Sequence, residues 1–125
     1  IVMALLAAEM RAARKKSLSE QFKELTGVVG NPSFRRKDSP LTEEMRIRLA
    51  GFESDPPALS SLAGLAVQAV ESRAAGNKEP IGGVKVRTSA GWFAIRPSGT
   101  EPLLKIYAES PEGESGIEKL FKAAA

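Results

Sequence analysis

Three short runs in the second half of the sequence constrain the fold most, because they favour strands and are separated by turn residues. They are "VKVRTSA", "GWFAIR" and "LLKIYAE", and the first two meet at a turn of Ala90 and Gly91. This pattern predicts a β-hairpin followed by a further strand. Since strand side chains alternate between two faces, Phe93 and Ile95 should share the core face, while Arg96 points away from it.

Helical patterns occupy the first part of the chain. Apolar residues recur at helical spacing through residues 1–16, and the cationic "RAARKK" suits a helix C-terminus. Ser17 and Glu20 have the spacing of a capping box for a second short helix, with Gly27 as its stop. The composition then shifts toward Gly, Asn, Pro and Ser, which predicts a domain boundary near residues 26–33 and an extended segment around residues 34–37.

The remaining elements complete the predicted order. Thr42 resembles an N-cap, and helical spacing continues to about Gly51, where a turn-rich connector begins. "LAVQAVESRA" favours a strand, although its alanines also permit a helix, and "GNKEPIGG" reads as a loop. Residues 113–125 predict a terminal helix. The order β, α, several strands, α indicates an α+β fold, with helices packed on one face of an antiparallel sheet.

Composition narrows the classes of function. A net charge of +3, from 18 basic and 15 acidic residues, suits one small anionic ligand and argues poorly for nucleic acid. The absence of cysteine excludes a disulfide framework and thiolate zinc sites, and makes the cytoplasm the expected location. The apolar "IVMALLAA" is too short to span a bilayer, so no membrane partner is expected. The chain lacks an initiator methionine, which suggests that it begins inside a longer protein.

The run "IRPSGTEP" lies between two predicted strands and holds the candidate chemistry. Arg96 and Lys105 should lie on the same non-core face, beside a turn whose glycine tolerates positive φ and lets backbone N–H groups converge. Serine and threonine hydroxyls would add donors, so the run predicts a phosphate-binding loop. A carboxylate beside a phosphate is repelled, so Glu101 should hold a neighbouring cation or cap a local N–H. The candidate binding residues are Arg96, Ser98, Gly99, Thr100 and Lys105, with Pro97 and Glu101 in supporting positions.

Simpler interpretations of these residues remain open. Pro, Ser, Gly and Thr are ordinary turn residues, and the connection could bind nothing. The chain has no histidine to activate Ser98, which argues against a nucleophilic serine. A small basic α+β domain could also bind nucleic acid, and a steep fall of affinity with salt would distinguish that function from one phosphate site. A bare interaction domain is a third possibility.

The residues of this loop also carry a family resemblance. "GWFAIRPSGTEPLLKIYAES" resembles the phosphate-binding loop and flanking strands in the C-terminal, fourth domain of the α-D-phosphohexomutase superfamily, and is most like bacterial phosphoglucomutase; "PIGGVKV" is similar to that glucose-specific branch. "IVMALLAAEM" and "KKSLSEQFKELT" look like closing helices of the third domain. The resemblance implies that residues 1–26 are those helices and that residues 27–125 form a substrate-phosphate-binding domain. Its expected order is β-α-β-β-β-α-like, similar to the TATA-box-binding protein, although residues 52–78 match least clearly.

The resemblance implies part of an enzyme of carbohydrate metabolism, an isomerase that works by intramolecular phosphate transfer. In the family, the preceding domains supply a phosphoserine, a magnesium loop and a sugar-recognising loop. No catalytic residue, metal site or cofactor is therefore expected here, and Mg²⁺ is expected in the full-length enzyme. The implied partners are upstream domains of the same chain and glucose 1-phosphate, glucose 6-phosphate and glucose 1,6-bisphosphate. Phosphomannomutase and phosphoglucosamine mutase remain alternatives.

Overall fold

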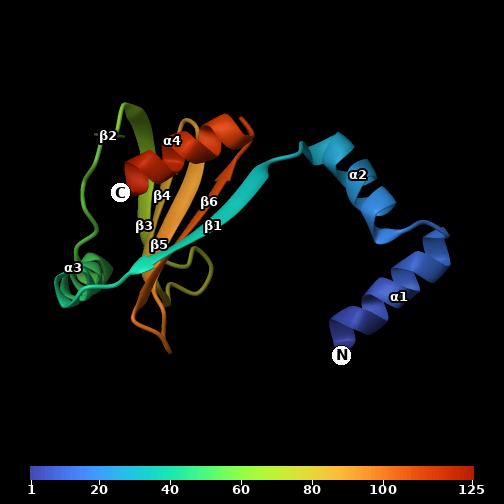
Figure 1. The fold of residues 1–125 in the computed structure, drawn as a ribbon, viewed down its shortest axis with the longest axis horizontal. Helices are drawn as coiled ribbons and strands as arrows, with labels where there is room; N and C mark the ends of the chain where they lie inside the picture. The colour runs from blue at the N-terminus through green and yellow to red at the C-terminus, as the bar shows by residue number, and fades with distance from the viewer. The chain divides into compact units, whose positions relative to one another are not determined.

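The structure is a computed structural model that describes residues 1–125, except for the side chain of Val29. The chain divides into two compact units, unit 1, Ile1–Asn31, and unit 2, Pro32–Ala125. Unit 1 contains two helices, and unit 2 contains a sheet with two further helices (Figure 1).

Helix α1 (Val2–Arg14) and helix α2 (Leu18–Val29) form unit 1. The capping box predicted at Ser17 and Glu20 is confirmed by two hydrogen bonds. The Glu20 N–H donates to Ser17 Oγ at 3.2 Å, and the Ser17 N–H donates to Glu20 Oε2 at 2.7 Å. These bonds satisfy backbone donors at the helix start that have no intrahelical partner.

The predicted stop of α2 at Gly27 is wrong. The helix runs through this position, and its C-cap is Gly30, which has a φ of 90° and donates its N–H to Thr26 O at 2.9 Å. A glycine ends a helix only where it leaves the helical conformation. The sequence offered two glycines three residues apart, and the later one makes that change.

Unit 2 is built on a six-stranded antiparallel sheet with the order β1-β6-β5-β4-β3-β2. Helix α3 (Glu43–Ser54) follows the first strand, and helix α4 (Glu114–Ala124) ends the chain. The strands are β1 (Ser33–Pro40), β2 (Ser61–Leu62), β3 (Leu65–Arg73), β4 (Pro80–Thr88), β5 (Gly91–Pro97) and β6 (Leu103–Ser110).

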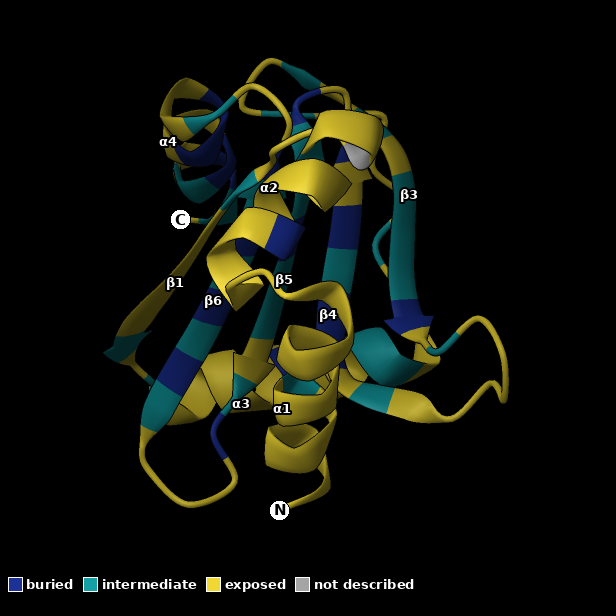
Figure 2. Cartoon of the chain, turned by 90° about the vertical axis from the view of Figure 1, so that its right-hand side faces the viewer, coloured by how far each residue is buried: buried dark blue, intermediate teal, exposed yellow. Residues whose placement is uncertain are grey.

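The core of unit 2 lies on one face of this sheet, between the strands and the two helices. Figure 2 shows buried stripes along β4 and β6, whereas α1 and α2 are coloured as exposed over most of their surfaces. The predicted α+β arrangement, with helices on one face of an antiparallel sheet, is therefore confirmed. The buried residues of the core cluster are Val84, Val86, Phe93, Leu104, Ile106 and Ala108 from the strands, Leu49 from α3, and Ile117, Leu120 and Ala123 from α4.

Several predicted boundaries need correction. "GNKEPIGG" is only partly a loop, because β4 begins at Pro80, which pairs with Arg73 of β3. Proline is tolerated at the first residue of a strand, so its presence did not exclude one. Helix α3 continues past Gly51 to Ser54, and the turn-rich connector includes the two-residue strand β2. The strand favoured within residues 65–74 is confirmed as β3.

Candidate functional site

The predicted loop is a tight connection between β5 and β6. β5 ends at Pro97, and β6 begins at Leu103. The Ser98 N–H donates to Leu103 O at 2.8 Å, and the Leu103 N–H donates to Glu101 O at 2.8 Å. The loop is therefore closed at its base by backbone hydrogen bonds, which limit where its tip can move.

Arg96 and Lys105 are cross-strand neighbours at the base of this loop. They are directly paired in the register of β5 and β6. They belong to the second face of the sheet, which we define as the face opposite the core, because Phe93 and Ile106 on the same strands are buried in the core. Paired residues of antiparallel strands have Cβ atoms about 4.5–5.5 Å apart, so both cations can reach one anion.

The surroundings of the two cations differ. Lys105 Nζ lies 3.9 Å from Glu101 Oε2, and Lys105 pairs in register with Asp38 of β1. A hydrogen bond from Arg36 holds the pKa of Asp38 below its usual value, so this carboxylate stays ionised beside Lys105. Among the described side chains, none forms an ion pair with the exposed Arg96. Arg96 is therefore the cation with its full charge available to a ligand.

The loop differs from the prediction in its backbone. Gly99 does not have a positive φ, and a Cβ placed on it would meet nothing within 4 Å. The Ser98 N–H is engaged in closing the loop, and Ser98 is only 6% exposed. The converging amides expected from a left-handed glycine are therefore not formed in this conformation. Gly99 and Thr100 are exposed, and within the described residues neither of their N–H groups has a backbone acceptor.

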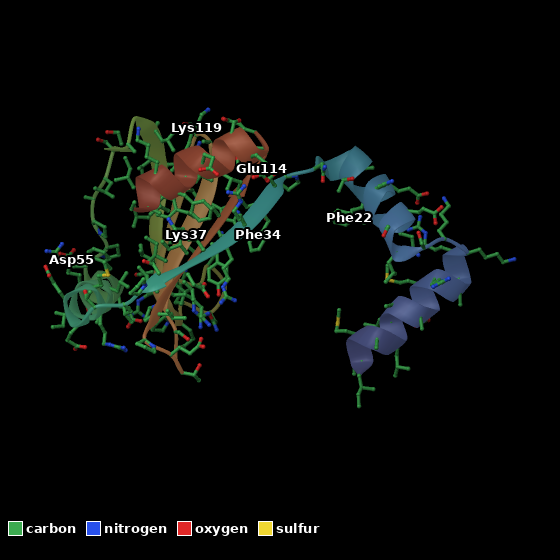
Figure 3. The ribbon with its side chains drawn as sticks, viewed as in Figure 1. Phe22, Phe34, Lys37, Asp55, Glu114 and Lys119 are labelled. Atoms are coloured by element: carbon green, nitrogen blue, oxygen red, sulfur yellow. The ribbon has the colours of Figure 1, made fainter. Side chains whose placement is uncertain are left out.

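Sequence reasoning missed an aromatic cluster on the second face. Trp92 donates its Nε1–H to Glu109 Oε1 at 3.2 Å, and Lys85 Nζ lies 4.4 Å from the centre of the Trp92 ring. Tyr107 stacks on Phe34 of β1 with ring centroids 6.4 Å apart. Figure 3 shows Phe34 on β1. The signal for this cluster was the strand alternation, since it puts these aromatic residues on the face that carries Arg96.

A depression of about 290 Å³ lies on the second face, and Arg96 and Gly83 are among the residues that line it. Its other lining residues include Lys85, Trp92, Ala94 and Tyr107. Aromatic rings, an alanine and two cations therefore surround this space. The arrangement can accept an anion at the loop while covering part of the attached group.

The described residues provide no group of three or more His, Cys, Asp or Glu side chains that could hold a metal ion. None of the described helices is both long enough and apolar enough to span a membrane.

The fold and the loop together define a class of protein: an α+β domain whose antiparallel strands β5 and β6 are joined by an exposed turn with a paired arginine and lysine. Comparison with known families makes the class specific. Residues 42–125 match the family described as phosphoglucomutase/phosphomannomutase, C-terminal domain, and this chain belongs to that family. The resemblance inferred from the sequence is thereby confirmed.

Individual relatives agree with this assignment. The phosphoglucomutase of Komagataeibacter xylinus is 36% identical over 136 residues, which cover 100% of this chain and 24% of that protein. A probable phosphoglucosamine mutase of Methanococcoides burtonii is 43% identical over 49 residues, 39% of this chain and 11% of that protein. Another from Methanocella arvoryzae is 50% identical over 42 residues, 34% of this chain and 9% of that protein. The chain thus spans about a quarter of the length of the phosphoglucomutase that it matches.

Proposed function

We propose that this chain is the substrate-phosphate-binding, C-terminal part of a phosphoglucomutase, which interconverts glucose 1-phosphate and glucose 6-phosphate. The loop at residues 96–102 would hold the phosphate of the sugar phosphate. The observation that carries the proposal is the register pairing of Arg96 with Lys105, which puts two cations at the base of one exposed turn. The similarity of the whole chain to part of a phosphoglucomutase supports the choice of enzyme.

The residues of the loop have complementary roles in this proposal. The planar guanidinium of Arg96 can donate two parallel hydrogen bonds to a phosphate, and Lys105 adds a compact positive charge. The Thr100 hydroxyl and the exposed amides at the tip can donate further bonds. Because acids lie beside Lys105, we expect Arg96 to contribute more of the binding free energy.

The chain alone should not catalyse the reaction. The loop can hold one end of a sugar phosphate, but it contains no pair of groups suited to transferring a phosphate. Such a grip would serve the reaction by orienting the sugar while its other end meets a reactive group elsewhere in the enzyme. That group, and the Mg²⁺ expected in the full-length enzyme, would belong to the part of the relatives that this chain does not cover.

Phosphomannomutase and phosphoglucosamine mutase remain candidate activities for the parent enzyme. Two relatives carry the name probable phosphoglucosamine mutase. A site that grips only phosphate binds all three sugar phosphates alike, so this domain should not set the choice of sugar. Similar affinities of the chain for glucose 6-phosphate, mannose 6-phosphate and glucosamine 6-phosphate would support the view that this domain binds the phosphate and does not select the sugar.

The test is a titration of the 125-residue chain with glucose 6-phosphate, followed by amide NMR signals. A few charge-assisted hydrogen bonds of about 1.5–3 kcal/mol each, offset by the cost of association, predict a dissociation constant of roughly 1 mM or weaker. The largest shifts should occur at Ser98, Gly99 and Thr100. Shifts confined to other residues would contradict the proposed site.

Arg96→Ala and Arg87→Ala form a matched pair of variants for this titration. Arg87 lies on the same face but near the other end of the hairpin, and its guanidinium is 3.5 Å from Glu71 Oε1. Arg96→Ala should weaken glucose 6-phosphate binding about tenfold or more, whereas Arg87→Ala should change it less than about twofold. Equal effects of the two variants would show general electrostatic attraction in place of a site at the loop.

A further inference from the structure

Gly83, the second of two consecutive glycines near the start of β4, lies directly against Arg96 at the beginning of the loop. The β4–β5 ladder runs from Thr88 paired with Gly91 to Val84 paired with Ile95, and Gly83 lies just beyond its last pair. Gly83 is buried, whereas Gly82 is exposed and has a φ of 68°.

The backbone of β5 leaves no room for a side chain at position 83. A Cβ built on Gly83 would lie 2.2 Å from Ile95 O, 2.8 Å from Arg96 Cβ and 3.0 Å from Arg96 Cα. The nearest atom belongs to the backbone, so it cannot move aside by changing a rotamer. Any other residue at position 83 would therefore displace β5 where it leads into the loop.

The neighbouring glycine has a different constraint. A Cβ on Gly82 would meet nothing within 4 Å, but its positive φ disfavours other residues. Gly82 and Pro97 line one small cavity together with Leu49 and Ala50 of α3. The pair of glycines thus lies beside two successive residues of β5, with Gly83 against Arg96 and Gly82 near Pro97.

We propose that Gly83 is a positioning residue for Arg96. Gly83 has no side chain with which to bind the phosphate, and it acts by letting β4 approach so closely that the Cα–Cβ bond of Arg96 has one direction. This inference rests on the proposed function, in which Arg96 binds the substrate phosphate. The paired hydrogen bonds of a guanidinium depend on its orientation, so even a small shift of the Arg96 backbone should weaken phosphate binding.

Gly91 provides a matched control at the other end of β5. A Cβ there would lie 2.2 Å from Glu109 O, the same distance as the clash at Gly83, and Gly91 also has a φ of 131°. It is five residues from Arg96, or about 17 Å along the strand. Gly83→Ala and Gly91→Ala should both destabilise unit 2, but only Gly83→Ala should disturb the loop.

The experiment measures glucose 6-phosphate affinity by NMR for the 125-residue chain and these variants, with the folded fraction determined for each. Gly83→Ala should weaken binding about tenfold in the folded protein, and Gly91→Ala less than about twofold. The double variant Gly83→Ala/Arg96→Ala should bind no more weakly than Arg96→Ala alone, because a residue that acts through Arg96 has nothing left to position.

The outcomes distinguish this inference from the proposed function. If Arg96→Ala leaves affinity unchanged, the proposed function fails, and the inference fails with it. If Arg96→Ala weakens binding but folded Gly83→Ala binds as Gly91→Ala does, or if the losses add in the double variant, the inference alone is overturned.

A Gly83→Ala chain that is unfolded in buffer is measured in trimethylamine N-oxide, which favours the folded state. If it stays unfolded there while Gly91→Ala folds, Gly83 is a folding requirement and the inference is overturned.

Discussion

Units 1 and 2 each contain two helices, but they bury apolar side chains very differently. In unit 1, Phe22, which is labelled in Figure 3, is 60% exposed. Helix α1 has no buried residue. In unit 2, α4 buries Ile117 and Leu120 completely. Helices in proteins are stabilised mainly by packing of an apolar face against other elements. The sheet of unit 2 provides this packing surface for α3 and α4. The described residues of unit 1 do not provide such a surface for α1 and α2.

Polar contacts link the two helices of unit 1. Its buried side chain, among those described, is Gln21, whose Nε2 donates to Met10 O at 3.3 Å and Lys16 O at 3.1 Å. These bonds fix the corner between α1 and α2 without a hydrophobic core. Apolar helix faces that lack partners within the unit support the proposal that residues 1–26 are the closing helices of a preceding domain.

The largest expected difference between the units concerns aromatic truncation. Phe93→Ala in unit 2 should lower the free energy of unfolding by about 3–5 kcal/mol, because Phe93 is 1% exposed and its removal leaves a cavity. Phe22→Ala in unit 1 should change it by less than about 0.5 kcal/mol. Urea unfolding, followed by amide NMR signals of β5, measures both. Comparable losses from the two variants would contradict the comparison.

Helix caps give a smaller and chemically matched test. Thr42 Oγ1 accepts the Met45 N–H at 3.2 Å at the start of α3, as Ser17 Oγ accepts the Glu20 N–H at the start of α2. Thr42→Ala should lower the free energy of unfolding of unit 2 by about 1 kcal/mol. Ser17→Ala should reduce the helix content of residues 18–29, measured by amide exchange, without changing unit 2. A response of unit 2 to both variants would show that the units unfold together.

Removal of residues 1–31 should have little effect on the stability of unit 2. The core cluster and the side chains packed against it all come from residues 41–124. We therefore expect the free energy of unfolding to change by less than about 0.5 kcal/mol, measured by urea unfolding of residues 32–125 against the full chain. A loss of several kcal/mol would show that unit 2 depends on unit 1.

The smallest expected effect is the response of α2 to pH. Hydrogen bonds from Ser17 lower the pKa of the Glu20 carboxyl from its ordinary 4.5. Because the pKa of Glu20 is lowered in the folded state, the stability that the Ser17–Glu20 capping box gives to α2 is fully present above pH 4.5. This stability is lost as the pH falls through the folded-state pKa. The helix content of residues 18–29 should therefore decrease in acid.

Glu20→Gln is the control for this pH response. An uncharged glutamine oxygen can still accept the Ser17 N–H, so the box should persist while its pH dependence disappears. Circular dichroism from pH 7 to pH 3 of the isolated residues 1–31 measures the change for both forms. An identical acid response of the two forms would assign the effect to another carboxylate.

The faces of the central strands could be predicted from the sequence because they depend on local alternation. Phe93 and Ile106 lie in the core, and Arg96 and Lys105 share the other face, as the period of two requires. The ends of α2 and β4 could not be predicted in the same way. Residue type does not decide which of the two glycines ends α2, since both can leave the helical conformation. Whether a Pro–Gly-rich segment joins a ladder depends on its partner strand, here Arg73 of β3 opposite Pro80.

In the candidate site, too, the features set by residue type and spacing could be predicted, and those set by strand packing could not. Residue types and spacing identified the loop and its cations, whereas the conformation of Gly99 differs from the one expected for its residue type. The close approach of Gly83 to Arg96 could not be foreseen, because it arises from the packing of two strands. The register also brings Lys85 over Trp92, a contact that pairing the predicted strands would have suggested.

The Trp92 environment gives the molecule a built-in optical reporter. Trp92 is the one tryptophan of the sequence and Tyr107 the one tyrosine, and both belong to unit 2. Intrinsic fluorescence excited above about 275 nm therefore comes from the second face of the sheet, and unit 1 does not contribute. With the Lys85 ammonium over the indole ring and Glu109 at its Nε1–H, emission should respond when a bound anion redistributes these charges. The fluorescence of the unlabelled protein therefore reports binding at the loop without a contribution from the N-terminal helices.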